Sequence, residues 1–140
     1  MTRVLAVLVL SAGAVAAAPK DVWVYKQATG ELSLNGKTVG TGYSGHGKDG
    51  VNNPAREKVK EVGPIPRGEY AIGSAFTHDT KGPVVMRLTP VGHTAHGRTG
   101  FLIHGDNKKM DRSASHGCIV LGPEVRKKVA DSGIKKLVVE

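Results

Sequence analysis

The sequence predicts an all-β or mainly β fold, a compact β-sandwich with one short helix near its C-terminus. The chain has 140 residues, which leaves no room for a second core. Its 19 Gly and 7 Pro residues are scattered between short apolar runs. This pattern favours many strands and turns over long helices or disorder. The apolar runs are rich in β-branched residues, as strands are.

Residues 1–17 have the order of a secretory signal peptide. Arg3 precedes an apolar run, Val4–Leu10, and small residues follow it. The run is too short to span a bilayer comfortably. Cleavage near Ala17 would leave residues 18–140 as a single domain, exported to the periplasm or cell envelope or secreted. The alternative is a buried or anchoring N-terminal helix.

Basic residues outnumber acidic ones, with 20 Lys and Arg against 12 Asp and Glu, and the excess is spread along the chain. Spread charge is typical of a solvated face. For an exported protein, the matching acidic partner is an anionic envelope surface of wall peptides, teichoic acids or lipids. Nucleic acid is not expected as a partner, because aromatic residues make up 4% of the chain and offer no stacking platform. No stable membrane span is expected either.

The expected domain opens as a β-meander. Val22–Gln27 is rich in β-forming residues, Glu31–Leu34 alternates, and Asn35-Gly36 is the strongest short hairpin signal. From Gly40 to Gly68, Gly and Pro are so frequent that backbone requirements dominate, which predicts a long surface loop. Loops of that length are usually functional or mobile. His46, within it, is expected to be solvated.

Further strands and the helix follow this loop. The expected strands are Tyr70–Ala75, Val84–Val91, Gly100–Gly105, Cys118–Leu121 and Lys135–Glu140. The helix is expected from about Glu124 to Ser132, because Pro123 suits a first turn and Gly133 suits a C-cap. Its apolar residues share one face. The basic residues expected to face solvent are Arg126, Lys127 and Lys128.

The only cysteine, Cys118, enters a strand directly after Gly117, and the preceding strand ends on His104. This places a thiol and an imidazole at neighbouring strand ends, as a nucleophile and its base require. A thiol is held as thiolate at neutral pH by an imidazolium or by peptide dipoles, and His104 supplies the first. The amides of Gly117 and Cys118 would face a developing oxyanion. The carbonyl of Gly105 would orient the imidazole.

Two other functions are compatible with these residues. His104 and Asp106 share a face at strand spacing, and His116 or Cys118 would complete the zinc site of an exported wall peptidase. No helical His-Glu-x-x-His pair supports that site. A papain-like or NlpC-type peptidase would place Cys before His, the reverse of this chain. The non-enzymatic alternative is an envelope-binding module in which Cys118 is buried packing.

The segment Ile103-His104-Gly105, followed by Ser115-His116-Gly117-Cys118, resembles the signature of the L,D-transpeptidases (YkuD-like catalytic domain), which are bacterial cell-wall enzymes. The opening hairpin from Trp23 to Tyr43 agrees, as does Pro64–Tyr70, which is similar to that family's Pro-x-Gly-x-Tyr entry to a strand. The resemblance implies a β-sandwich of the L,D-transpeptidase catalytic type. Three motifs are more similar to a short branch that includes toxins delivered by type VI secretion. They are Gly42-Tyr43-Ser44-Gly45, Asn52-Asn53-Pro54 and His104-Gly105-Asp106-Asn107.

The resemblance also implies residue roles. Cys118 would be the nucleophile and His104 the general base. Residues that would support the site or its oxyanion hole are Gly105, Ser115, His116 and Gly117. Residues that would contact substrate are Tyr43, Ser44, Asp106 and Asn107. The resemblance implies no metal and no cofactor.

The implied substrate is a peptidoglycan stem tetrapeptide, attacked at the carbonyl of its third residue with release of the terminal D-Ala. A thioester on Cys118 would then pass to an amine, giving a crosslink or an exchanged D-amino acid, or to water, giving L,D-carboxypeptidase activity. This chain departs from the family in two ways. The span between His104 and Ser115 is short, which leaves less lid over the site. Val120 stands where many members carry Arg or Asn, which counts against crosslinking as the main outcome.

Two biological roles remain open at this stage: maintenance of the cell's own wall and attack on a neighbour's wall. The signal peptide favours the first role, and the effector-like motifs favour the second. A toxin would add an immunity protein as a partner.

Overall fold

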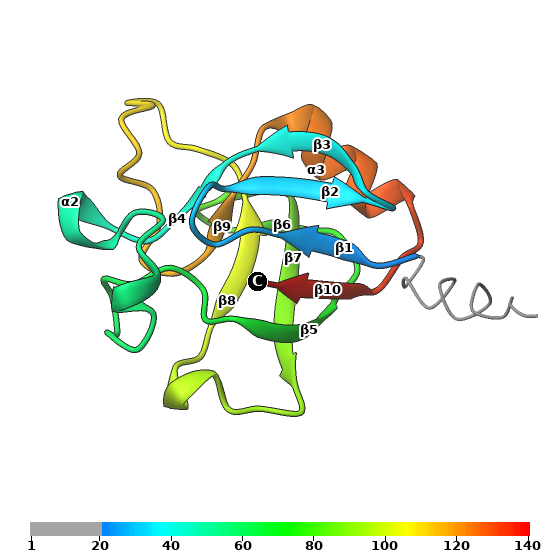
Figure 1. Cartoon of the computed structure of the whole chain (residues 1–140). Coiled ribbons are helices and arrows are strands. Elements are labelled where there is room, and N and C mark those ends of the chain that lie inside the picture. Colours follow the sequence, from blue (N-terminus) through cyan, green and yellow to red (C-terminus); the bar gives the residue numbers. More distant parts are fainter. Residues whose placement is uncertain (1–20) are drawn as a thin grey trace, which may run out of the picture.

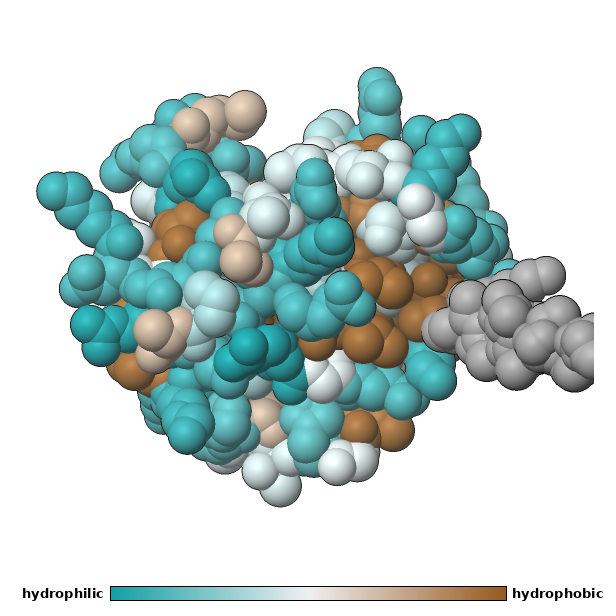
Figure 2. Space-filling model, viewed as in Figure 1, coloured by the Kyte–Doolittle hydropathy of each residue, from teal (hydrophilic) through white to brown (hydrophobic). Residues whose placement is uncertain are grey.

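The structure is a computed structural model that describes residues 21–140 (Figure 1). The predicted signal peptide and its cleavage near Ala17 lie outside these residues. Within them, no helix combines the length and the apolar character needed to cross a membrane. Hydrophilic residues cover most of the face shown in Figure 2, with hydrophobic patches between them.

Ten strands in this part of the chain form one sheet, in which most neighbouring pairs are antiparallel. They are β1 (Trp23–Tyr25), β2 (Glu31–Leu34), β3 (Lys37–Thr41), β4 (Tyr43–Ser44), β5 (Gly68–Ile72), β6 (Phe76–His78), β7 (Gly82–Val91), β8 (Phe101–His104), β9 (Ile119–Val120) and β10 (Lys136–Val139). The helices are the single turn α2 (Gly47–Gly50) and α3 (Pro123–Asp131), with short 3-10 segments at Pro54–Arg56 and Ala95–Gly97. The strand order is β3-β2-β1-β10-β5-β7-β8-β9-β4, and β6 pairs with β7. The predicted mainly β class is confirmed.

The sheet nearly closes because its two edge strands are consecutive in the chain (Figure 1). β3 stands at one end of the strand order and β4 at the other, and only Gly42 separates them. A Cβ on Gly42 would overlap the carbonyl oxygen of Val120. The chain therefore passes from one edge of the sheet to the other at a position where only glycine fits. This closure places β4 beside β9, the strand that follows Cys118.

The predicted hairpin is confirmed. Asn35 and Gly36 have φ of 51° and 82°, and Leu34 pairs with Lys37 across a two-residue loop. Positive φ at both central residues is what a type I′ turn requires. The predicted long loop from Gly40 to Gly68 is interrupted by the end of β3, by β4 and by α2. β4 forms only because β9 lies beside it, and the local composition carries no sign of that partner.

One core fills the space inside the curved sheet. Its largest fully buried side chains include Trp23, Tyr25 and Tyr70. β1 and β10 pair in parallel, with Trp23 opposite Leu137, so the two ends of the described chain lie side by side in the sheet. α3 packs against β7 through Val129, which is buried.

α3 begins and ends close to the predicted positions, and Gly133 has the positive φ of 73° expected after a helix end. The prediction that Arg126 faces solvent is wrong, since its side chain is buried. Arg126 lies three residues before Val129 and therefore shares its inward face. The long apolar stem of an arginine can be buried there while its guanidinium reaches backbone carbonyls. This burial brings a cation to the edge of the candidate site.

Candidate active site

The parallel pairing of β8 and β9 sets the geometry of Cys118 and His104. His104 stands opposite Val120, which places Cys118, two residues earlier, opposite Leu102. Side chains alternate between the faces of a sheet, so Cys118 and His104 point to the same face. Strands about 4.8 Å apart with about 3.3 Å per residue put their Cα atoms about 8 Å apart on the diagonal. The structure therefore brings the predicted thiol and imidazole to one face of two neighbouring strands, two residues apart along the strand direction.

His104 is held in one tautomer by its own neighbour. Its Nδ1 lies 2.7 Å from the carbonyl oxygen of Gly105, the contact that the sequence predicted. A carbonyl only accepts, so Nδ1 carries the proton and Nε2 keeps a lone pair. Burial lowers the pKa of His104, and the nearby cations Lys81 and Arg126 lower it further, against the Gly105 hydrogen bond, which raises it. At neutral pH the imidazole is therefore an uncharged base.

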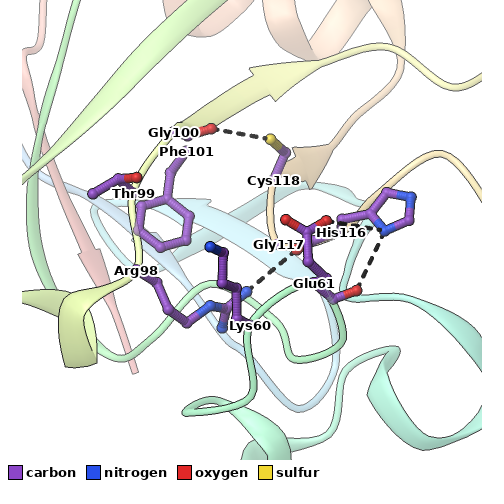
Figure 3. A pocket seen from close by; sticks show the side chains of 9 residues that line it. All are labelled: Lys60, Glu61, Arg98, Thr99, Gly100, Phe101, His116, Gly117 and Cys118. Atoms are coloured by element: carbon purple, nitrogen blue, oxygen red, sulfur yellow. Dashed lines mark hydrogen bonds and ion pairs between the residues drawn. The ribbon is translucent and has the colours of Figure 1, made fainter.

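The thiol of Cys118 is partly exposed, and its Sγ lies 3.7 Å from the carbonyl oxygen of Gly100 (Figure 3). Removal of water around the sulfur raises the pKa of Cys118, while the Leu102 amide and the charges of Lys81 and Arg98 lower it. With the pKa of the thiol raised and that of the imidazole lowered, the resting site holds a neutral pair. The structure thus differs from the expectation of a thiolate kept by an imidazolium. The proton has to move during the attack itself.

Ser115 fixes the turn that carries the thiol. Its buried Oγ donates to the carbonyl oxygen of Cys118 and accepts from the amides of Gly45 and Gly117, with the two amide nitrogens each 3.0 Å away. The structure therefore gives Ser115 the supporting position that was predicted. It also corrects the predicted oxyanion hole, because the Gly117 amide is already engaged by Ser115. Of the two predicted amides, that of Cys118 remains as the candidate donor.

Arg98 stabilises the same turn by donating hydrogen bonds to backbone carbonyls in the turn and in the neighbouring loop. Its buried guanidinium donates to four carbonyl oxygens. The acceptors are Glu57 at 2.6 Å, Pro64 at 2.9 Å, Gly63 at 3.0 Å and His116 at 3.3 Å. A Cβ on Gly117, whose φ is 138°, would lie 2.5 Å from Nη2 of Arg98, so this close approach requires glycine. The sequence carries no local sign of Arg98, because its acceptors lie 18 to 41 residues away.

A small cavity of about 130 Å³ opens beside the thiol (Figure 3). It is lined by Lys60, Glu61, Arg98, Thr99, Gly100, Phe101, His116, Gly117 and Cys118. His116 is an exposed part of its wall, with Nδ1 3.3 Å from the carbonyl oxygen of Glu61. Its ring stacks on His46 with 4.2 Å between ring centroids. His46 is therefore not simply solvated as predicted, and its buried Nδ1 has no hydrogen-bond partner among residues 21–140.

Tyr43 and Asp106 belong to a second hollow, which is also lined by Gly105, the residue after His104, but by neither His104 nor Cys118. The Tyr43 hydroxyl donates to Asp106 Oδ1 at 2.8 Å and accepts from the Ala114 amide at 3.0 Å. Burial, the largest cause, raises the pKa of Tyr43 to about 12. The hollow, here called the acceptor groove, has a volume of about 460 Å³. Its walls include Tyr43, Lys81, Gly105, Asp106, Val120 and Arg126.

Ser44 and Asn107 do not line either hollow. Ser44 is fully buried, donates to the Gly117 carbonyl at 3.2 Å and accepts from the Ile65 amide at 2.8 Å. The predicted substrate contact of Ser44 is therefore wrong, since the residue is an internal support. Asn107 shapes the loop after β8, where its Nδ2 donates to Ser113 Oγ at 3.0 Å and its Oδ1 accepts two backbone amides.

The residues considered for a zinc site are not assembled as one. Across residues 21–140, no three His, Cys, Asp or Glu side chains come together as a possible metal-binding group. Nδ1 of His104 is taken by Gly105, and Asp106 Oδ1 is taken by Tyr43.

The family model of the Tlde1 domain matches residues 38–139. The chain belongs to the Tlde1 domain family. This domain is L,D-transpeptidase-like and is associated with type VI effectors, so the resemblance carried by the Ser-His-Gly-Cys motif is confirmed. No curated protein sequence matches the chain.

A solved L,D-transpeptidase shares the fold. The crystal structure of an L,D-transpeptidase from Mycobacterium tuberculosis H37Rv aligns with a TM-score of 0.50 and 18% identity, over 85% of this chain and 57% of that chain. An L,D-transpeptidase from Mycobacterium smegmatis aligns with a TM-score of 0.48 and 17% identity, over 85% of this chain and 58% of that one. The Tlde1-domain chain thus spans less than two thirds of the length of these structures.

Proposed function

We propose that this Tlde1-domain protein is a cysteine-dependent peptidoglycan-modifying enzyme. It acts on stem tetrapeptides at the carbonyl of the third residue and releases or exchanges the terminal D-Ala. The observation that carries the proposal is the placement of Cys118 and His104 on one face of two parallel strands, with the Nδ1 proton of His104 committed to Gly105. Membership of the Tlde1 domain family and the L,D-transpeptidase fold support it.

In the first step the sulfur of Cys118 forms a bond to the substrate carbonyl carbon, and its proton passes to Nε2 of His104. The resulting imidazolium donates from Nδ1 to the carbonyl of Gly105, which stabilises it. Negative charge gathers on the substrate oxygen, where the Cys118 amide is the candidate donor. A neutral resting pair is suited to this step, because the base and the thiol are both in the required protonation state.

In the second step the carbon–nitrogen bond to D-Ala breaks, and the proton on Nε2 of His104 passes to the departing amine. The products are free D-Ala and a thioester on Cys118. The thioester is then attacked by a D-amino acid or by water, while His104 takes the proton of the attacking group and returns it to the sulfur. We propose release and exchange as the main outcomes, because Val120, on the same face as Cys118, offers no polar contact to a second stem peptide.

The proposal includes export to the periplasm or cell envelope, where the substrate is found, and contact with its anionic surface through the net charge of +8. Association of the domain with type VI effectors favours attack on a neighbour's wall, and an immunity protein is then an expected partner.

The test incubates the protein with tetrapeptide-containing muropeptides and a D-amino acid, followed by mass spectrometry. We expect loss or exchange of D-Ala, reduced by at least about 10³-fold in Cys118→Ala and in His104→Ala. Lys127→Ala, an exposed cation on α3, is the matched control and retains activity. A thermal melt of each variant checks folding.

Unchanged muropeptides with folded protein would contradict the proposal and favour the envelope-binding module. Equal activity in the Cys118 and His104 variants would contradict the proposed roles of these two residues. Turnover that a chelator abolishes would instead favour the zinc peptidase.

A further inference from the structure

Arg126 is a buried cation without an acidic partner. Its guanidinium donates from Nη1 to the Leu121 carbonyl at 2.8 Å and from Nε to the Val84 carbonyl at 3.2 Å. In the described part of the chain, no carboxylate forms an ion pair with it and Nη2 has no hydrogen-bond partner. Burial alone lowers the pKa of Arg126. Nη2 itself reaches the protein surface. A guanidinium that is mostly buried and keeps a donor at the surface gains from an anion placed beside it.

The position of this guanidinium is next to the reactive pair. A side chain on Gly105 would overlap Nη1 of Arg126, so the cation lies directly against the residue that follows His104. Both Gly105 and Arg126 line the acceptor groove. The free donors of Arg126 are therefore on the His104 side of the site, away from the small cavity beside Cys118.

Lys81 supplies a second cation to the same groove. It is an exposed residue in the turn between β6 and β7, and it lines the groove together with Arg126. Its charge acts on both Cys118 and His104, which places it near the two reactive groups at once. The one acid among the lining residues is Asp106, already held by the Tyr43 hydroxyl and the Asn107 amide. Two cations against one acid leave this groove suited to an anion.

The chemistry of the proposed reaction identifies the anion that would bind in the acceptor groove. Because His104 gives its proton to the departing amine, the leaving residue has to lie on the His104 side of the scissile bond. The incoming amine of an exchange reaction, which gives its proton to His104, has to occupy the same place. Both are D-amino acids, and each carries a free α-carboxylate one carbon away from the reacting nitrogen.

We infer that the acceptor groove is the subsite for the leaving and incoming D-amino acid, and that Arg126 and Lys81 bind its α-carboxylate. This inference rests on the proposed function and names the part of the substrate that the site recognises. A substrate whose terminal carboxylate is blocked loses its partner and leaves the buried Arg126 unpaired.

The test compares two stem tetrapeptides that differ only at the C-terminus, one with a free carboxylate and one with a carboxamide. We expect the wild-type protein to favour the free acid by about tenfold in kcat/KM, the value of one charge-assisted hydrogen bond. Lys81→Met lowers kcat/KM for the acid by more than for the amide, so that the preference for the acid falls from about tenfold to about threefold, with Arg126 still present. Lys127→Met is the matched control and keeps the preference.

Arg126→Lys keeps a cation but loses the free Nη2 donor, and we expect it to weaken the preference as well. A thermal melt separates this effect from misfolding, and Lys81→Met tests the inference alone if the Arg126 variant unfolds. Equal cleavage of acid and amide by the wild-type protein, or an equal loss for both peptides in Lys81→Met, would overturn the inference and leave the proposed function standing. If the folded wild-type protein cleaves neither peptide, the proposed function itself fails.

Discussion

The two sides of the reactive pair each rest on a buried arginine, and the two arginines differ in how many donors remain free. Arg98, on the Cys118 side, gives its guanidinium to four carbonyl oxygens. Arg126, on the His104 side, gives two hydrogen bonds and keeps Nη2 unpartnered within residues 21–140. A guanidinium whose donors are all hydrogen-bonded stabilises the backbone around it, while one that keeps free donors can still bind an anion. The same residue type therefore stabilises the backbone on one side, and on the other side it keeps the donor that we propose binds substrate.

The two hollows beside these arginines also differ in volume. The cavity beside Cys118 measures about 130 Å³, and the acceptor groove measures about 460 Å³. The narrow side has its turn fixed by Ser115 and Arg98, as suits a nucleophile that needs a defined position. The wide side has room for an amino acid to leave and another to enter.

The largest expected effect on stability separates the two arginines directly. Arg98→Met leaves four carbonyl oxygens without a donor. At about 1 kcal/mol for each, the lower end of the usual cost of an unpaired buried group, we expect a loss of about 4 kcal/mol in the free energy of unfolding. Arg126→Met leaves two, and we expect a loss of about 2 kcal/mol. Urea denaturation of both variants measures the difference. A larger loss in Arg126→Met than in Arg98→Met would contradict the stabilising role assigned to Arg98.

A smaller effect concerns Glu57, whose carbonyl accepts from Arg98 and whose carboxylate holds Gln27 and Arg67. The hydrogen bond from Arg67, the largest cause, lowers the pKa of Glu57 to about 2 from 4.5. The stabilisation from this shift is fully present above about pH 4.5 and is lost as the pH falls through about 2. We expect about 1–2 kcal/mol, because the Arg67 side chain is half exposed and screened.

Glu57→Gln removes this pH-dependent part, and urea denaturation at pH values from about 2 to 7 measures it. The matched control is Glu61→Gln, because the Glu61 side chain is exposed. An equal loss of stability in acid for Glu57→Gln and the wild-type protein would show that the pair with Arg67 contributes nothing.

The smallest effect is a shift in the pH profile. Because the pKa of His104 is lowered from 6.5, its basic form persists in mild acid, and the acidic limb of kcat/KM lies below pH 6.5. Burial is the main cause, and the charges of Lys81, Arg126 and His78 add to it. Lys81→Ala removes one cation, so we expect the limb to move to higher pH. The measurement uses the amidated peptide, so that loss of carboxylate binding does not enter.

Lys127→Ala leaves the limb in place, since this lysine is on the exposed side of α3. A limb in Lys81→Ala that stays in place or moves to lower pH would remove Lys81 from the surroundings of His104.

The parts of the fold that the sequence predicted are those with local causes. The turn at Asn35-Gly36 depends on two adjacent residues, and the ends of α3 depend on Pro123 and Gly133. β4 could not be predicted, because two residues make a strand there only when Ile119 and Val120 lie alongside. The sequence likewise predicts a substrate contact for Ser44, two residues after Gly42, whereas the structure pairs its hydroxyl with the Gly117 carbonyl and the Ile65 amide.

By itself, the sequence determined the mainly β class and predicted Cys118 and His104 as the reactive pair, because strand patterns and the short motif around the thiol depend on neighbouring residues. The tertiary structure alone decided which arginine is satisfied and which amide Ser115 takes. It also decided that the resting pair is neutral. These properties depend on burial and on partners up to 70 residues away in the chain, as between Ser115 and Gly45. A guanidinium has the same chemistry in every sequence, and only its surroundings decide whether it has donors left to bind a substrate.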